Sequence, residues 1–269
     1  MDMNTVVGSH DLLFITLDTL RYDVAQELAG KGRTPVLSAL IPGGQWERRH
    51  SPASFTYAAH QAFFAGFLPT PATPGLHPRL FAMRFEGSET TTPETCLFEA
   101  PDLVTGLAAR GYHTLCIGGV GFFNKLTPLG RVLPGLFAES HWGPELGVRE
   151  PRSTEHQVAL AVRRLEALPR EQRVFLFLNV SALHQPNRHY LSGATQDSRA
   201  SHAAALEYVD TQLPPLFAAL RRRGPSFCIV CSDHGTAYGE EGYTGHRLGH
   251  PAVWTVPYAE FLLPWEAAP

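Results

Sequence analysis

The sequence predicts an α/β protein built as a three-layer sandwich, in which a mostly parallel sheet lies between helices on both faces. Continuous apolar runs of strand length indicate strands buried on both faces, which is typical of parallel sheets. Segments with the period of helices separate these runs, and this alternation favours a layered α/β fold. The strands are expected at residues 12–17, 114–117, 174–180, 227–231 and 258–263, and the helices at 22–28, 58–64, 103–110, 155–168 and 202–222.

A single domain spanning residues 1–269 is expected, because no repeat or clear boundary separates two units. Two irregular segments, 69–93 and 124–151, are rich in Pro and Gly. Long irregular segments inside a compact domain are often functional, so we expect these two to roof a ligand site.

Charge and apolar patterning exclude several classes of partner. A formal net charge of −3 with 17% charged residues predicts no basic face for nucleic acid. No apolar run approaches the length of a membrane span, so no membrane partner is expected. The first residues lack the basic and apolar regions of a secretory signal, which favours a cytoplasmic location. The oligomeric state stays open, with a homodimer as one alternative.

The spacing of Cys228 and Cys231 is that of a redox or zinc motif, yet both residues lie in one apolar run. Residues three apart in a strand point to opposite faces. We therefore interpret both cysteines, and Cys116 in a similar run, as small buried core residues.

Asp18 directly follows the first apolar run. Ligand groups in open α/β sheets lie at the carboxyl ends of the strands, so this carboxylate is a candidate ligand. The alternative is that Asp18 caps the following helix. Arg21 and Asp23 are interpreted as a local ion pair.

Thr56 stands at the predicted start of a helix of small residues. Backbone N–H groups at a helix start favour anions such as phosphate or sulfate, so Thr56 is a candidate nucleophile. A plain N-cap threonine is the alternative. His60 lies one turn later on the same helix face, where it could touch the same anion or be structural.

Further polar groups follow other strands. Asp233 and His234 end the run at 227–231, and His246 and His250 follow in a Gly-rich segment. His184 follows the run at 174–180 and is expected to face the crevice. A surface role is the alternative for these later histidines. The glycine-rich segment after residue 117 lacks the spacing of a nucleotide-binding loop, and its Asn124 and Lys125 are candidates for a substrate rim.

These segments together resemble the sulfatase-like branch of the alkaline phosphatase superfamily. The resemblance spans residues 12–257 and rests on three motifs: the strand ending in LDTLRYD, the segment TYAAHQAFFAGFLP, and SDHG followed by GH and TVP. The chain is most similar to short sulfatase-like hydrolases. The resemblance implies an alkaline-phosphatase-like core, here expected without the C-terminal subdomain of large sulfatases.

Carried over by position, the resemblance implies one metal site formed by Asp18, Thr56, Asp233 and His234. His60 takes the place of an arginine of the sulfatase signature. His184 and His246 match substrate-contacting residues. A second metal site that uses His246 or His250 stays open, because Asp210, the nearest match to a further ligand motif, is followed by Pro214 where a histidine would stand.

The departures from the family pattern limit which reaction and which metal ion are expected. Residue 56 is Thr and not Cys, which excludes formylglycine, and Thr19 replaces a second aspartate. A donor set of carboxylates, imidazole and hydroxyl suits Zn or Mn better than Ca, with Mg or Ca as alternatives.

The sequence therefore predicts a metal-dependent hydrolase of a small anionic ester, with Thr56 as nucleophile. Phosphate esters are favoured over sulfate esters, because a plain hydroxyl has no hemiacetal route to expel sulfate, and the choice among monoester, diester and phosphonate stays open. His60, His184 and His246 are expected to donate to the developing charge or to protonate the leaving oxygen. The alternatives are a transferase or mutase that uses the same site, and a non-catalytic protein that binds an anion or metal.

Overall fold

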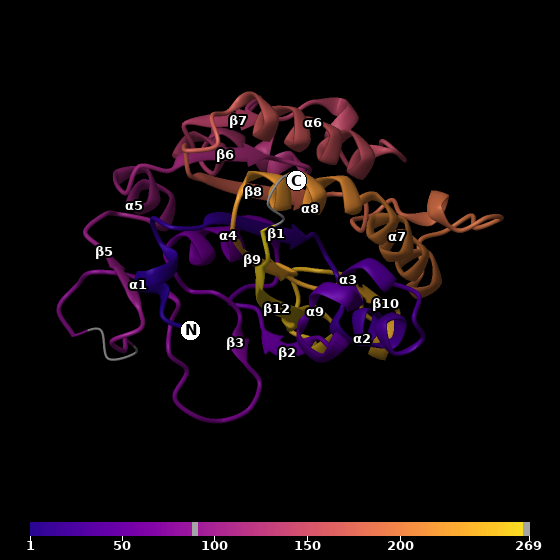
Figure 1. Ribbon diagram of the computed structural model, residues 1–269. Coiled ribbons are helices and arrows are strands. Elements are labelled where there is room, and N and C mark those ends of the chain that lie inside the picture. Colours follow the sequence, from indigo (N-terminus) through magenta and orange to yellow (C-terminus); the bar gives the residue numbers. More distant parts are fainter. Residues whose placement is uncertain (88–90, 266–269) are drawn as a thin grey trace.

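The computed structural model describes residues 1–87 and 91–265, and an eight-stranded sheet forms its centre (Figure 1). The strand order is β3-β2-β12-β9-β1-β8-β6-β7. Five neighbouring strands run parallel: β9 (Ser226–Cys231), β1 (Asp11–Leu17), β8 (Val174–Val180), β6 (His113–Ile117) and β7 (Glu139–His141). Three strands join by antiparallel pairing: β12 (Thr255–Leu263), β2 (Glu47–His50) and β3 (Thr70–Pro71).

Helices and two small sheets surround this sheet. The helices are α1 (Met3–Val6), α2 (Tyr22–Gly30), α3 (Pro35–Leu40), α4 (Thr56–Phe64), α5 (Leu103–Ala109), α6 (Ser153–Ala167), α7 (Arg199–Gln212), α8 (Pro214–Arg223) and α9 (Pro251–Trp254). The small sheets pair β4 (Phe81–Met83) with β5 (Cys96–Phe98), and β10 (Ala237–Tyr238) with β11 (Thr244–Gly245). In the parts of the chain that the structure describes, no helix is both long and apolar enough to cross a bilayer.

The central strands are buried on both faces, which explains their continuous apolar sequences. In β1, Leu13, Ile15 and Leu17 pack into one core with α2, α3, α6, α7 and α8. Leu12 and Phe14 point the other way and pack with α1, α4 and α5. Because successive strand residues alternate between faces, both sets must be apolar. The predicted three-layer α/β fold with a mostly parallel sheet is therefore confirmed.

The predicted elements are present, with two corrections. The helix expected at 202–222 is two helices, α7 and α8, because Pro214 lacks the N–H that would continue the α7 ladder. The strands β2, β3 and β7 were not predicted, since they are short and half-buried or exposed and carry no apolar run. The cysteines of the apolar runs are free and buried, as expected.

The carboxyl ends of β9, β1, β8 and β6 lie side by side, because parallel neighbours point the same way. Gly235 follows β9, and its N–H donates to the Val253 carbonyl at 2.6 Å. A Cβ on Gly235 would lie 2.0 Å from the Ala252 carbonyl oxygen. Only glycine allows the chain after β9 to pack this closely against α9.

We predict that Gly235→Ala lowers the free energy of unfolding by about 2–4 kcal/mol, because backbone must move to relieve the overlap. Gly135→Ala is the matched control, since nothing lies within 4 Å of the Cβ it would add. Urea unfolding of both variants measures the difference. Equal stabilities would contradict the close packing of Gly235 on α9.

Candidate active site

Three buried side chains meet at the carboxyl ends of β1 and β9. Asp18 follows β1, and Asp233 and His234 follow β9. One ligand atom from each of the three lies within 4.8 Å of the others, and all three side chains are fully buried. Strands that are neighbours in the sheet thus bring together residues that are far apart in the sequence.

Asp18 points one oxygen toward a hydrogen-bond donor and leaves the other without one. Asn179, in β8, donates to Asp18 Oδ2 at 3.0 Å. Asp18 Oδ1 is buried and has no hydrogen-bond partner. The alternative that Asp18 caps a helix does not hold, because Arg21 is the N-cap of α2.

Thr19 has a strained backbone that places a hydrogen-bond donor beside Asp233. Its φ of 65° is costly for a β-branched residue, and such strain is concentrated at functional sites. This conformation turns the Thr19 N–H toward Asp233 Oδ1 at 3.2 Å, while its hydroxyl donates to the Leu183 carbonyl at 3.1 Å. Asp233 Oδ2 is left buried without a hydrogen-bond partner, like Asp18 Oδ1.

His234 has a defined tautomer. Its Nδ1–H donates to the Gly235 carbonyl at 2.8 Å, so Nε2 carries a lone pair. Nε2 lies 3.5 Å from Asp233 Oδ2 and 3.2 Å from Thr56 Oγ1. Burial lowers the pKa of His234, which favours this neutral form.

Thr56 is the first residue of α4, and its hydroxyl reaches the same group of side chains. Phe55 is the N-cap, so the interpretation of Thr56 as a plain cap does not hold. Thr56 Oγ1 lies 3.5 Å from Asp18 Oδ2. The first-turn N–H groups of a helix have no acceptor within it, so the start of α4 is suited to an anion.

The two carboxylates are electrostatically unfavourable without a cation. Burial raises the pKa of Asp18 from 3.8 to about 6, and repulsion from Asp233 adds to the shift. Burial likewise raises the pKa of Asp233 to about 6. Two buried carboxylate oxygens without donors and one imidazole lone pair are a donor set that suits Zn²⁺ or Mn²⁺. Asp18, Asp233 and His234 therefore fit a divalent metal ion.

His60 lies in the core, where its ring contacts the backbone of Thr56, and it does not line the cavity beside Thr56. Its Nδ1–H donates to the Thr56 carbonyl at 2.7 Å, and Nε2 accepts from the Thr16 hydroxyl at 3.0 Å. Phe63, Phe123 and Phe177 each lie 5.4 Å from its ring centroid. Burial lowers the pKa of His60 to about 3, which keeps it neutral. His60 is fully buried, with Nδ1 3.8 Å from Asp233 Oδ2, and a contact with the substrate stays a prediction.

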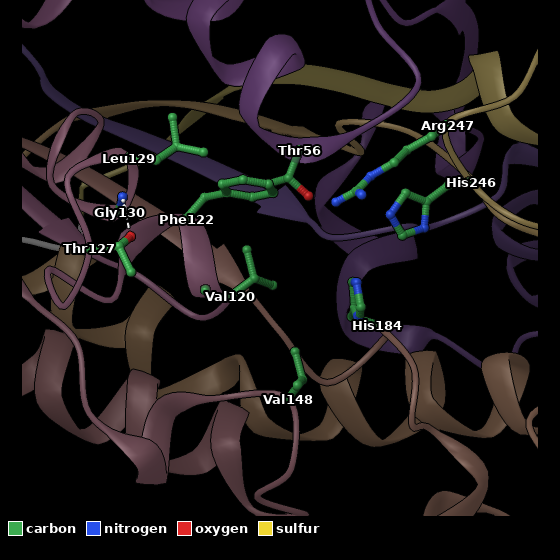
Figure 2. Close-up of a pocket in the computed structure, with 11 residues that line it drawn as sticks. Thr56, Val120, Phe122, Thr127, Leu129, Gly130, Val148, His184, His246 and Arg247 are labelled. Atoms are coloured by element: carbon green, nitrogen blue, oxygen red, sulfur yellow. Dashed lines mark hydrogen bonds between the residues drawn. The ribbon is translucent and has the colours of Figure 1, made fainter.

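A cavity of about 250 Å³ opens beside Thr56 (Figure 2). His184 and His246 line it, with ring centroids 5.6 Å apart, and His246 lies 4.6 Å from the His234 ring. Burial, followed by the neighbouring His234 and His184, lowers the pKa of His246 to about 3. Both histidines thus lie where the sequence places substrate contacts, and their roles stay predictions.

Arg247 is a cavity residue that the sequence analysis missed. Figure 2 shows its guanidinium pointing toward Thr56 and the cavity. Its φ of 68° and an N–H bond to the Ser54 carbonyl at 2.9 Å set this direction. Its position next to His246 was the available signal, but the sequence does not reveal the unusual backbone conformation.

Three other candidates lie outside this site. His250 caps α9 through Nδ1, which accepts from Ala252 at 3.0 Å, and it lines a different cavity. Asn124 accepts from the Leu126 N–H, and Lys125 donates to the Ser140 carbonyl. Neither side chain lines the cavity beside Thr56. The rim role of Asn124 and Lys125 and a metal or substrate role for His250 stay predictions.

The two irregular segments also differ in their relation to the cavity. Thr127, Leu129, Gly130 and Val148 line it, so the segment 124–151 forms part of its wall. In the described part of the segment 69–93, no residue lines it, and residues 88–90 lie outside the described residues. Asp210 is also remote, because it accepts N–H bonds at the start of α3. Within residues 1–87 and 91–265, neither His246 nor His250 joins a second metal cluster.

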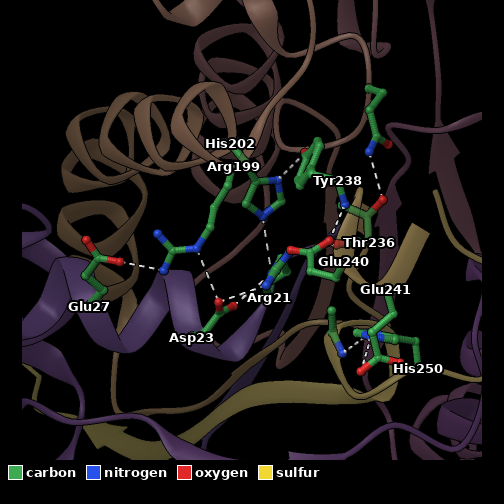
Figure 3. A network of polar contacts seen from close by, with 12 residues as sticks. Arg21, Asp23, Glu27, Arg199, His202, Thr236, Tyr238, Glu240, Glu241 and His250 are labelled. Carbon is green, nitrogen blue, oxygen red and sulfur yellow. Dashed lines mark hydrogen bonds and ion pairs between the residues drawn. The ribbon is translucent and has the colours of Figure 1, made fainter. Parts of the chain in front are cut away.

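A polar network holds the segment that carries His246 and Arg247 (Figure 3). Arg21 donates to Asp23 at 2.8 and 2.9 Å, which confirms the predicted ion pair, and also pairs with Glu240. Tyr238 lies 3.0 Å from His202 of α7 through its hydroxyl. The network ties the start of α2 to the hairpin of β10 and β11, which leads directly into His246.

Comparison of structures found known proteins that are similar to this chain. No family model and no curated protein sequence matches it. The periplasmic domain of the phosphoethanolamine transferase EptC from Escherichia coli, in complex with Zn, aligns with a TM-score of 0.62 and 14% identity, covering 96% of this chain and 73% of that one. A protein in the alkaline phosphatase superfamily from Vibrio parahaemolyticus aligns with a TM-score of 0.56 and 14% identity, covering 96% and 62%.

A candidate sulfatase from Bacteroides thetaiotaomicron aligns with a TM-score of 0.57 and 12% identity, covering 94% of this chain and 64% of that one. The fold of this chain is that of the alkaline phosphatase superfamily. Within that superfamily the fold is sulfatase-like, as the sequence motifs predict.

We predict that Asp18→Asn and Asp233→Asn each weaken binding of Zn²⁺ or Mn²⁺ by at least about a hundredfold, because each removes a charged ligand. Neither change should destabilise the metal-free protein, since each relieves the repulsion between the carboxylates of Asp18 and Asp233. Asp210→Asn, a buried carboxylate elsewhere in the fold, is the matched control and should bind metal normally. Calorimetric titration measures affinity, and unchanged affinity in both site variants would show that the metal binds elsewhere.

Metal affinity should also depend on pH in a defined window. The pKa values of Asp18 and Asp233 are raised from 3.8 to about 6, so the stability that these two groups contribute to the metal-free protein is full below about pH 3.8 and is lost as the pH rises through 6. The metal competes with these protons, so its affinity should rise about tenfold to a hundredfold from pH 5 to pH 7 and then level off. Titration with Mn²⁺ at several pH values measures this. An equal affinity at pH 5 and pH 7 would contradict it.

Proposed function

We propose that this protein is a metal-dependent enzyme that cleaves small phosphate esters, with Thr56 as its nucleophile. One observation carries the proposal: the Thr56 hydroxyl stands at the start of α4, 3.2 Å from His234 Nε2 and 3.5 Å from Asp18 Oδ2. Its neighbours Asp18 and His234 belong to the group in which Asp18 and Asp233 each have one oxygen without a hydrogen-bond donor. An ordinary hydroxyl there favours phosphate over sulfate esters, because it has no hemiacetal route to release sulfate.

Asp18, Asp233 and His234 would hold the metal ion. When bound, a divalent ion there supplies positive charge that favours the deprotonated Thr56 side chain and the phosphate oxygens. The Zn in the structure of the transferase from E. coli supports zinc among the candidates. Thr19, Asn179 and Gly235 act on these ligands through their hydrogen bonds, and so orient them.

The reaction begins with attack by Thr56 Oγ1 on phosphorus. A bond from Oγ1 to phosphorus forms while the bond from phosphorus to the alcohol oxygen breaks. The electron pair leaves with the alcohol oxygen, which takes up a proton, and the hydroxyl proton of Thr56 passes to solvent through the cavity. Arg247 and the start of α4 stabilise the nonbridging oxygens, and His184 and His246 lie where they can donate to the substrate.

The phosphorylated Thr56 has two fates. Attack by water would release phosphate and make the protein a hydrolase, whereas attack by a second alcohol would make it a transferase. The similarity in fold to phosphoethanolamine transferases favours the second alternative as a further candidate. Product analysis with an added acceptor alcohol distinguishes a hydrolase, which releases phosphate, from a transferase, which forms a new phosphate ester.

We predict that Thr56→Ala lowers kcat by at least about 10³-fold with bound metal retained, because the nucleophile is lost while the charged ligands remain. The assay uses p-nitrophenyl phosphate, its diester and its sulfate with Zn²⁺, Mn²⁺ and Mg²⁺. Thr211→Ala, the same change at an exposed position of α7 that does not line the cavity, should keep most activity.

Full activity in Thr56→Ala would assign the attack to water and not to Thr56. A wild-type protein that binds metal but cleaves none of the three substrates would favour a non-catalytic binding protein.

A further inference from the structure

The cavity beside Thr56 has two chemically different sides. Figure 2 shows His184, His246 and Arg247 on one side of Thr56 and Phe122 with Leu129 on the other. The second side is formed mainly by apolar groups and by backbone: Val120, Gly121, Phe122, Leu129, Gly130 and Val148, with Thr127 among them. We call these seven residues the apolar wall.

Charge is distributed unevenly between these sides. Among the described residues that line the cavity, Arg247 is the one that carries a permanent charge. The ring of His234, a candidate metal ligand, lies 4.6 Å from the ring of His246, so His234 adjoins the same side of the cavity as Arg247. The phosphate group of a substrate therefore belongs on the charged side, and the alcohol group must extend along the apolar wall.

The apolar wall is held in a fixed position relative to the nucleophile. Phe122 packs against Tyr57 and Phe55 at the start of α4, with ring centroids 5.6 and 6.3 Å apart. Asn179 Oδ1 accepts the N–H groups of Gly119 and Val120 at 3.2 and 3.1 Å, while its amide nitrogen donates to Asp18. The same amide thus links the apolar wall to a candidate metal ligand.

The cavity is open to solvent, and its volume indicates what fits beside Thr56. An apolar cavity of about 150 Å³ can hold a benzene molecule. The cavity here has about 250 Å³, which leaves room for a phosphate group and one ring of that size. A sugar or an alkylammonium alcohol would bury polar groups against Val120, Phe122 and Val148, where few hydrogen-bond partners are present. An apolar alcohol would instead gain free energy from leaving water.

We propose that the enzyme selects phosphate esters whose alcohol is apolar and about the size of one ring, and that Phe122 determines this selectivity. This inference rests on the proposed function, because it assigns the substrate class of the same site. Phe122 contributes the face against which the alcohol packs, while Thr56 and the metal ligands act on the phosphate. The alcohol oxygen leaves with the electron pair of its bond to phosphorus and takes up a proton.

The test compares benzyl phosphate with glycerol 3-phosphate and phosphoethanolamine, each also as its methyl diester. All three are esters of primary alcohols, so differences in leaving-group reactivity are small. The wild-type enzyme should show a kcat/KM at least about tenfold higher for the benzyl ester. Phe122→Ala should remove most of this preference by raising KM for the benzyl ester, and should leave kcat/KM for the glycerol ester nearly unchanged.

Two further variants make the result specific. Phe122→Leu should keep most of the preference, because it restores an apolar face, and it replaces Phe122→Ala if that variant does not fold. Phe85→Ala is the matched control, since Phe85 is 66% exposed and does not line the cavity. A glycerol ester cleaved as well as the benzyl ester, or an equal loss for both in the Phe122 variants, would overturn the inference and leave the proposed function standing.

A binding measurement separates the two proposals if no ester is cleaved. Calorimetry then compares benzylphosphonate with hydroxymethylphosphonate on the wild-type protein loaded with Zn²⁺. Binding of the benzyl compound at least about tenfold more tightly, with loss of that difference in Phe122→Ala, would support the apolar wall although catalysis fails. Equal binding of both phosphonates would overturn it.

Discussion

The site depends on one constraint: two carboxylates, Asp18 and Asp233, are buried side by side with one oxygen each left without a donor. Their positions follow from the pairing of β1 with β9, which brings the two strand ends together. Like charges in a dry environment repel strongly, and burial adds a desolvation penalty. A bound cation would remove both penalties, and this supports the proposed metal site between these groups.

The surrounding residues act together to hold these ligands in place. The N–H of Thr19, whose backbone is strained, donates a hydrogen bond to one oxygen of Asp233. The side-chain amide of Asn179 donates a hydrogen bond to one oxygen of Asp18. His60 donates a hydrogen bond to the carbonyl of Thr56 and thereby fixes the start of α4. Side chains that are held by packing and hydrogen bonds lose little entropy when substrate binds, which is a general requirement for efficient catalysis.

Much of this arrangement could be predicted from sequence, and the failures have physical reasons. Continuous apolar runs revealed the central strands, and polar residues at their ends revealed Asp18 and Asp233. The spacing of His60 from Thr56 correctly put both on one helix face, but that face also covers the core, and the ring binds backbone there. Arg247 was missed because the direction of its side chain depends on a left-handed backbone conformation, which no local sequence pattern predicts. The strand β2 was missed because its sequence is charged.

The most direct test of the cation between the two carboxylates is a crystal structure of the protein grown with Zn²⁺ or Mn²⁺, with anomalous scattering to locate the ion. We expect one strong anomalous peak in contact with Asp18, Asp233 and His234 and next to the Thr56 hydroxyl. A map without a peak at these residues, with the two carboxyl groups sharing a proton, would contradict the metal site.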